Sequence, residues 1–228
     1  DNVLLETNIE DKISLYGLYD PDQNNLSIEL WKGSDGEEIK KIFDKIISKD
    51  LSKDALDILE IAILTNSNPP NINISKNEFY NFQKNFLIKK NDLDLIKLFV
   101  EKNPEFIFKD DLINFYINHY LAEANIKKSC EIFDKIEDVT LENDYSVKLK
   151  IYCLINSNKT EQGLLIYDLK KEMGLKDEFF EKKIFKLIGF ETEEDKQVSD
   201  KNLLEFHLSH RTLDNFEYTP DQNTSKKI

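Results

Sequence analysis

The chain has 228 residues, of which 40% are hydrophobic and 33% are charged, a composition typical of a folded protein rather than a disordered or membrane-embedded one. Its formal net charge is −13, from 44 acidic and 31 basic residues, which opposes binding to the phosphate backbone of nucleic acids. No stretch approaches the ~18–20 consecutive apolar residues that span a bilayer. We therefore expect neither a nucleic-acid partner nor membrane insertion.

Residues 1–33 differ from the rest of the chain because they carry strand and turn signals instead of a helical pattern. Leu26, Ile28 and Leu30 alternate with other residues, and Asp, Asn and Pro precede them. We therefore expect an extended arm or a loose hairpin. Trp31, the only tryptophan, is expected to pack this arm onto the first helix pair, because an indole buries a large apolar area.

The arm ends in the stretch GSDG, residues 33–36, which precedes a helix. A glycine-rich loop before a helix can bind phosphate, but this one lacks the Lys-Ser/Thr pair of phosphate-binding loops. Ser34 stands three residues before Glu37, which is the spacing of a capping box. Glu37 and Glu38 would repel an anion, so we predict a helix cap at Ser34 and no phosphate site.

From Ser34 onward the sequence predicts about ten helices of roughly 10–15 residues each. In the first of them, apolar residues recur at i, i+3, i+4 and i+7 from Ile39. Ser52 and Ser75 are expected as N-caps, and Pro104 marks a helix end. The helices are expected within residues 37–47, 52–64, 75–87, 91–104, 111–124, 126–136, 143–155, 159–173, 177–188 and 199–213.

The helices form pairs, and the pairs repeat with a spacing of roughly 33–39 residues. Asn91, Asn125 and Asn158 separate the two helices of three pairs, and Asn accepts the left-handed conformation that such turns often require. The pattern predicts an all-α fold, a right-handed α-solenoid of about five helix hairpins. We assign residues 34–214 to this helical-repeat domain and residues 215–228 to a polar C-terminal tail.

This arrangement resembles the tetratricopeptide-like helical repeats over residues 75–174. The small residue that this family places on the second helix is matched by Ser129 or Cys130 and by Gly163, whereas its Trp…Leu-Gly…Tyr pattern is absent. The resemblance implies a superhelix whose first helices form a concave binding face. The leader GLYDPDQNNLSIELWKGSD followed by helices is also similar to a bacterial helical-repeat family of unknown function, which implies no activity.

The first helix of each pair carries the residues that the resemblance assigns to a binding face. Residues one turn apart on a helix share a face, so neighbouring first helices would line one groove. His119 also lies on an apolar helix face, which favours a position in the core. The candidate partner-binding residues are Tyr80, Asn81, Lys84, Tyr116, His119, Glu123, Lys148 and Tyr152.

The sequence contains few residues that could bind a metal or act in catalysis. Cys130 and Cys153 are expected to be buried free thiols, with a bridge as the alternative in an oxidising compartment. His207 and His210 stand three residues apart, but a zinc site needs at least three protein ligands. The Asp-rich turn at Asp20 lacks the glycine and the glutamate of a calcium loop. We expect no metal, no cofactor and no catalytic residue.

These observations favour a non-enzymatic helical-repeat scaffold that binds a protein or peptide partner. One alternative is a helical accessory region of a larger cell-envelope enzyme whose catalytic domain is not in this chain. Another is an enzyme that uses the region of His207 and His210, for which partner residues are lacking. The sequence begins without Met, which fits a trimmed start or a removed signal peptide and, in the second case, export to the periplasm.

Overall fold

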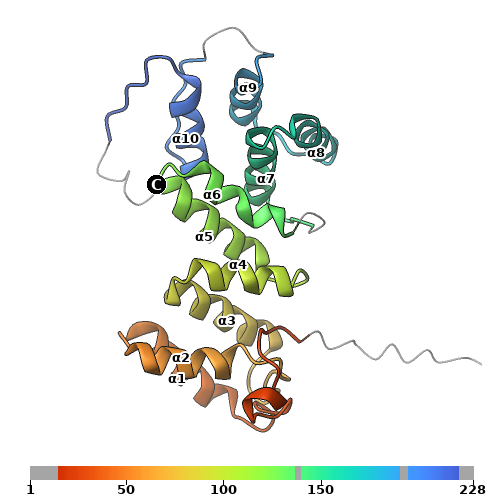
Figure 1. Cartoon of the computed structure of the whole chain (residues 1–228), viewed down its shortest axis with the longest axis vertical. Helices are drawn as coiled ribbons and strands as arrows, with labels where there is room; N and C mark the ends of the chain where they lie inside the picture. Colours follow the sequence, from red (N-terminus) through yellow and green to blue (C-terminus); the bar gives the residue numbers. More distant parts are fainter. Residues whose placement is uncertain (1–14, 137–139, 191–194, 221–228) are drawn as a thin grey trace, which may run out of the picture. The chain divides into compact units, whose positions relative to one another are not determined.

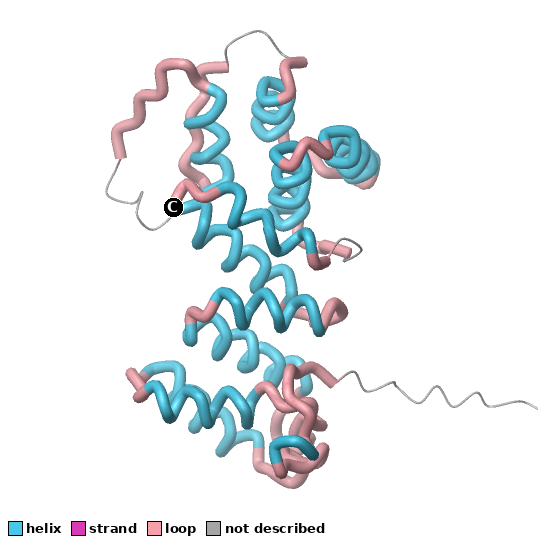
Figure 2. The backbone as a smooth tube through the Cα atoms, viewed as in Figure 1, coloured by secondary structure: helices cyan, strands magenta, loops and turns pink. Residues whose placement is uncertain are grey.

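The computed structural model describes residues 15–136, 140–190 and 195–220, which form α-helices, two short 3₁₀-helices and loops (Figures 1 and 2). The predictions of an all-α fold and of about ten helices are confirmed, and no strand occurs in this described part. The chain divides into two compact units, which we call unit 1 (residues 1–92) and unit 2 (residues 93–228).

Unit 1 is built from three helices that follow a structured leader. The Ser52 side chain accepts a hydrogen bond from the second helix, and Ser75 forms the predicted capping box with Glu78 at the start of the third. Both caps are local signals, which explains why the sequence alone locates them. The elements are the 3₁₀-helix η1 (Asp22–Asn24) and the helices α1 (Gly36–Ser48), α2 (Lys53–Ile63) and α3 (Lys76–Lys90).

The leader, residues 15–33, forms turns and η1 rather than the extended arm or loose hairpin that the sequence predicts; residues 1–14 of that arm lie outside the described residues. The backbone N–H groups of Leu18 and Tyr19 both donate to Leu64 O, at 2.6 and 3.1 Å. The buried amide of Gln83 donates to carbonyls of the leader and of α2, at 3.2 and 2.9 Å. The leader is thus held by backbone hydrogen bonds instead of by a partner strand.

Trp31 packs the leader onto the helices as predicted. Its ring meets Phe43 of α1 and Phe79 of α3 edge-on, with centroids 6.2 and 5.4 Å apart. The indole is half-buried rather than largely buried. Trp31 is therefore an anchor at the edge of the aromatic core of unit 1.

The GSDG stretch is used for close backbone packing. Asp35, rather than Ser34, is the N-cap of α1, so the predicted cap is wrong by one residue. The reason is tertiary: Gly36 N donates to Ile72 O at 2.7 Å, which fixes where the helix begins. A Cβ atom at Gly36 would lie 2.4 Å from Cβ of Ile74, so only glycine fits this contact.

Replacing Gly36 with alanine should lower the free energy of unfolding of unit 1 by about 2 kcal/mol, because the added methyl group overpacks a contact made by backbone. Urea denaturation followed by Trp31 fluorescence would measure this loss. Gly33→Ala serves as a comparison: this glycine lies in open space, so its replacement should cost only the strain of a backbone φ of 85°, about 1 kcal/mol. A Gly36→Ala protein as stable as the parent would show that Ile74 moves aside at no cost.

Unit 2 contains seven α-helices along its described residues, and most of them follow the predicted pairing. The helix predicted over residues 126–136 is α-helical only to Cys130 and then tightens into a 3₁₀-helix. The elements are α4 (Leu93–Lys102), α5 (Lys109–Ala122), α6 (Ile126–Cys130), η2 (Glu131–Asp134), α7 (Asp144–Asn156), α8 (Thr160–Glu172), α9 (Glu178–Leu187) and α10 (Leu203–Thr212).

The turns inside the pairs keep the predicted period, with one residue shifted. Asn91 and Asn158 have positive φ angles of 53° and 60°, as predicted for left-handed turn residues. In the intervening turn the left-handed residue is Ala124, with φ 55°, and not Asn125. Asn125 instead caps α6, since its side chain accepts a hydrogen bond from Lys128 N at 3.2 Å.

Helix α10 departs from a simple repeat. In a solenoid each repeat contacts only its neighbours, but α10 packs on α5 as well as on α9. Leu204 and Leu208 are its buried apolar residues. Part of the predicted polar tail folds back onto the same helix, where the rings of Phe216 and Tyr218 meet Phe206 at 5.6 and 4.9 Å. Residues 221–228 of that tail lie outside the described residues.

Candidate functional site

The α7–α8 hairpin of unit 2 places one helix at the surface with little cover. Gly163 lets α8 approach α7 closely, since a Cβ there would lie 3.3 Å from Ile151 O. Only Gly163 and Tyr167 of α8 are buried, both on the side that faces the protein. In Figure 1, α8 lies on the outer side of α7, away from α10.

An apolar stripe runs along the exposed side of α8. We call Leu165, Leu169 and Met173 the α8 stripe; they stand four residues apart, so they share one face of the helix. Their side chains are 61%, 51% and 78% exposed. Three large apolar residues in one row on a helix mark an interaction surface more often than scattered exposed residues do.

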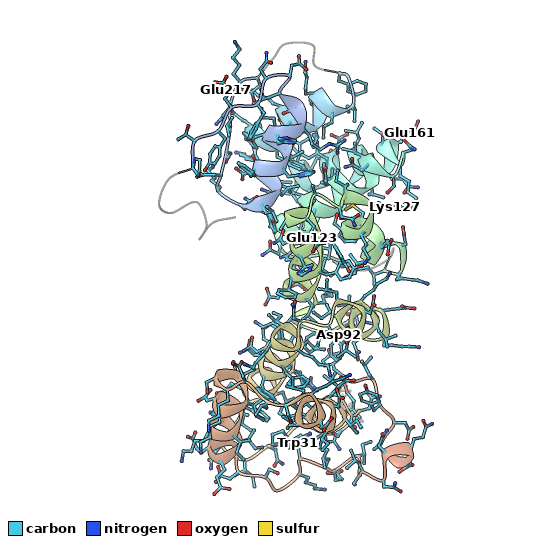
Figure 3. All side chains as sticks on the ribbon, turned by 60° about the vertical axis from the view of Figure 1, so that its left-hand side comes forward. Trp31, Asp92, Glu123, Lys127, Glu161 and Glu217 are labelled. Atoms are coloured by element: carbon cyan, nitrogen blue, oxygen red, sulfur yellow. A yellow bond between two sulfur atoms is a disulfide. The ribbon has the colours of Figure 1, made fainter. Side chains whose placement is uncertain are left out.

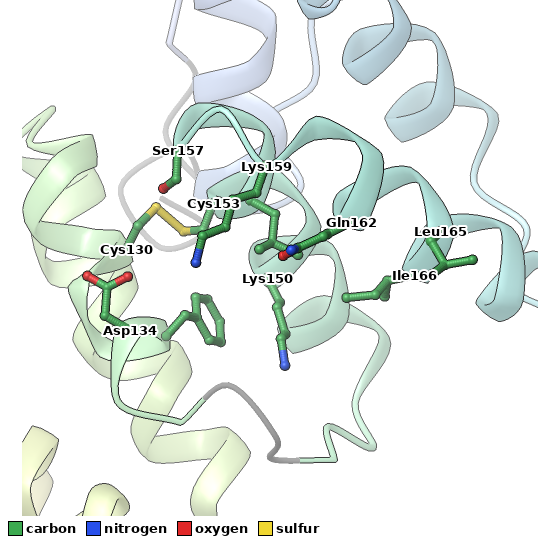
Figure 4. A pocket seen from close by; sticks show the side chains of 11 residues that line it. Cys130, Asp134, Lys150, Cys153, Ser157, Lys159, Gln162, Leu165 and Ile166 are labelled. Carbon is green, nitrogen blue, oxygen red and sulfur yellow. A yellow bond between two sulfur atoms is a disulfide. The ribbon is translucent and has the colours of Figure 1, made fainter.

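A cavity of about 280 Å³ adjoins the stripe along one edge (Figure 4). The Cys130–Cys153 disulfide lies at one end of the cavity, and Leu165 and Ile166 lie at the other. A second hollow of about 250 Å³ continues past Ile166 to Met173. The stripe and the two hollows together form one mostly apolar surface on α7 and α8. The first hollow is lined by Cys130, Phe133, Asp134, Lys150, Cys153, Leu154, Ser157, Lys159, Gln162, Leu165 and Ile166.

The two cysteines form a disulfide, so the expectation of free thiols is wrong and the alternative holds. Their Cα atoms are 5.3 Å apart, and 23 positions separate them in the sequence. The bond joins the end of α6 to α7, two helices of neighbouring pairs. Such a bond persists in oxidising compartments, and it is therefore compatible with an exported protein.

The predicted partner-binding residues do not form one exposed face. Tyr80 of unit 1 and Tyr116 and Tyr152 of unit 2 are buried, so they pack the cores of their units. Asn81 and Lys84 of unit 1 are half-buried. A partner role for the residues that reach the surface stays a prediction.

Three charged positions of the predicted face in unit 2 differ in their surroundings. His119 is 36% exposed and lies 3.7 Å from Glu123, so its expected place in the core is wrong. Lys148 lies 2.7 Å from Asp177, the N-cap of α9, and this ion pair is largely shielded from solvent. Lys148 is thus a structural contact between α7 and α9.

Helix α10 occupies part of the same face. Tyr152 of α7 accepts a hydrogen bond from Arg211 at 2.7 Å, and its hydroxyl lies 2.9 Å from Nε2 of His207. Arg211, the only arginine of the chain, also donates to Asn156. The first helices of unit 2 are therefore covered here by the chain itself, whereas the α8 stripe remains exposed.

Burial, with the nearby charges of Arg211 and His210, lowers the pKa of His207 to about 4. The imidazole is thus neutral at pH 7, which suits a hydrogen bond with the Tyr152 hydroxyl. The ring of His210 packs against Phe216 at 5.1 Å. Within the described ranges, no group of three His, Cys, Asp or Glu side chains could hold a metal ion.

Sequence reasoning missed the α8 stripe because α8 carries apolar residues on two sides. Gly163 and Tyr167 mark the side that packs on α7, whereas Leu165 and Leu169 lie on the exposed side. The spacing of four between the exposed leucines was the available signal.

Comparison of the chain with protein families, with curated proteins and with solved structures finds no match. Among the described residues, no helix is both long enough and apolar enough to cross a bilayer.

Proposed function

We propose that the protein is a non-enzymatic helical scaffold that binds a protein or peptide partner through the α8 stripe and the adjoining cavity. The observation that carries this proposal is the row of Leu165, Leu169 and Met173, exposed beside a hollow that can receive a side chain. Grooves next to exposed apolar helix faces are typical sites for amphipathic segments. The repeated helix pairs and the resemblance to tetratricopeptide-like repeats support the same class of function, as an analogy of fold.

The geometry also supports a binding role over a catalytic one. About half of the side chains around the cavity are apolar, and the others are two lysines, Ser157, Gln162 and one carboxylate, Asp134. General acid–base catalysis needs groups within hydrogen-bond reach of a reacting atom, with pKa values suited to the step. His207, the histidine with a lowered pKa, is engaged with Tyr152 and serves the packing of α10.

A selection from a displayed peptide library would test the proposal. Peptides that bind the full chain should lose at least about tenfold in affinity for the variant Leu165→Ser/Leu169→Ser, because a few apolar anchors carry most of the energy of such interfaces. The free energy of unfolding should change by no more than about 0.5 kcal/mol, since both side chains are exposed.

The matched control is Leu98→Ser/Ile107→Ser, which removes two other exposed apolar side chains of unit 2. Its affinity for the selected peptides should equal that of the parent. Peptides that bind the parent and the α8 variant equally well, or a selection that enriches none, would contradict the proposal.

A further inference from the structure

The acidic residues of α8 all lie along one edge of the α8 stripe. Glu161 stands four residues before Leu165, and Asp168 stands three residues after it. Glu172 stands three residues after Leu169. These spacings place the three carboxylates along the same side of the stripe. All three are exposed, and none forms an ion pair with another described residue. Glu161 lies on the outer side of α8 (Figure 3).

The opposite edge of the stripe combines Ile166 with the lysines that line the two hollows. Ile166 follows Leu165 directly and lines both hollows. Lys170, the next residue along this edge, donates to Leu141 O at 3.3 Å and is thereby directed toward the loop before α7. Lys171, behind the acidic edge, pairs with Glu181 of α9. The carboxylates are therefore not neutralised by the lysines nearest to them.

From this arrangement we infer that the occupant of the α8 stripe is an amphipathic helix with a basic edge, an inference that rests on the proposed function. Its apolar side chains would lie on Leu165 and Leu169 and enter the hollow beside Ile166. Its Lys or Arg side chains would meet Asp168 and Glu172. A segment with an acidic edge would bring like charges together, so charge selects among amphipathic partners.

Two designed peptides of about 18 residues, long enough for five helical turns, test this inference. Both carry leucines on one face; one edge of that face is lysine in the first peptide and glutamate in the second. By fluorescence anisotropy at low salt, the lysine peptide should bind the full chain at least about tenfold tighter than the glutamate peptide. The difference should shrink at about 0.5 M NaCl, because salt screens exposed charges.

An acidic protein attracts lysine-rich peptides everywhere, so the decisive comparison uses two charge variants. Asp168→Lys/Glu172→Lys reverses the edge of the stripe, and Glu101→Lys/Glu217→Lys reverses exposed carboxylates elsewhere in unit 2. Both change the formal net charge of −13 by the same four charges. The first variant should lose the preference for the lysine peptide, whereas the second should keep most of it.

The outcomes separate the two proposals. If Leu165→Ser/Leu169→Ser abolishes peptide binding but the two charge variants behave alike, the inference is overturned and the binding site stands. If none of the variants changes binding, both proposals fail. If sedimentation shows that the chain self-associates, and the leucine variant alone is monomeric, the occupant is a second copy and the inference is overturned.

Discussion

Replacing Cys130 and Cys153 with alanine should lower the free energy of unfolding of unit 2 by about 3 kcal/mol. The disulfide closes a loop defined by a separation of 23 positions, and it restricts the unfolded chain accordingly. Urea denaturation followed by circular dichroism would measure the loss, and hydrogen exchange would locate it at the amides of α6 and α7. The two helices should exchange faster, since the bond joins them directly.

Reduction provides the control for this prediction. Dithiothreitol should destabilise the parent by a similar amount and leave the double-alanine variant unchanged, because that variant has no bond to reduce. Equal stabilities of the oxidised parent, the reduced parent and the variant would contradict the prediction. They would show that α6 is held in place by its packing against α5 and α7 alone.

The disulfide also illustrates why the sequence predicts the helices better than the site. Helix positions depend on local periodicity and on caps such as Ser52 and Ser75, which act within one turn. Whether Cys130 meets Cys153 depends on how two helix pairs pack, and their spacing leaves both outcomes open. The same holds for Asp35, which caps α1 in place of Ser34 because of a contact some 36 positions away along the chain, at Ile72.

In unit 2, the last helix explains why the first helices do not form an open face. The resemblance to tetratricopeptide-like repeats implies that first helices form an open face, and the choice of the tyrosines among the candidate residues follows from it. In unit 2, α10 returns to α5 and covers Tyr152 through His207 and Arg211. No period in the sequence encodes this return, because it is a contact between repeats that are not neighbours. The open apolar surface consequently lies on α8, a second helix.

The stability of unit 2 should fall as the pH decreases from about 6.5 to about 4, through His207. Burial lowers the pKa of this imidazole to about 4 in the folded protein, from 6.5 as its ordinary value, and the charges of Arg211 and His210 act in the same direction. Between these two pH values His207 binds a proton in the unfolded chain but not in the folded chain, so protonation favours unfolding. Tyr152 is the group from α7 that faces the His207 ring. Because its hydroxyl accepts a hydrogen bond from Arg211, the hydroxyl proton is free to be donated to Nε2 of the neutral His207.

A shift of this size corresponds to at most about 3 kcal/mol, and solvent screening of the partly exposed ring should reduce it to roughly 1–2 kcal/mol. Urea denaturation at a series of pH values would compare the parent with His207→Gln, which can keep a hydrogen bond to Tyr152 but does not titrate. The difference between their free energies of unfolding should be constant above pH 7, change between about pH 6.5 and about pH 4, and be constant again below. The effects of carboxylate protonation occur in both proteins and cancel in this difference. NMR titration of the His207 ring should give a midpoint near 4. Parallel curves for the two proteins, or a midpoint near 6.5, would show that α10 leaves His207 open to solvent and that its contact with Tyr152 does not hold the helix on α7.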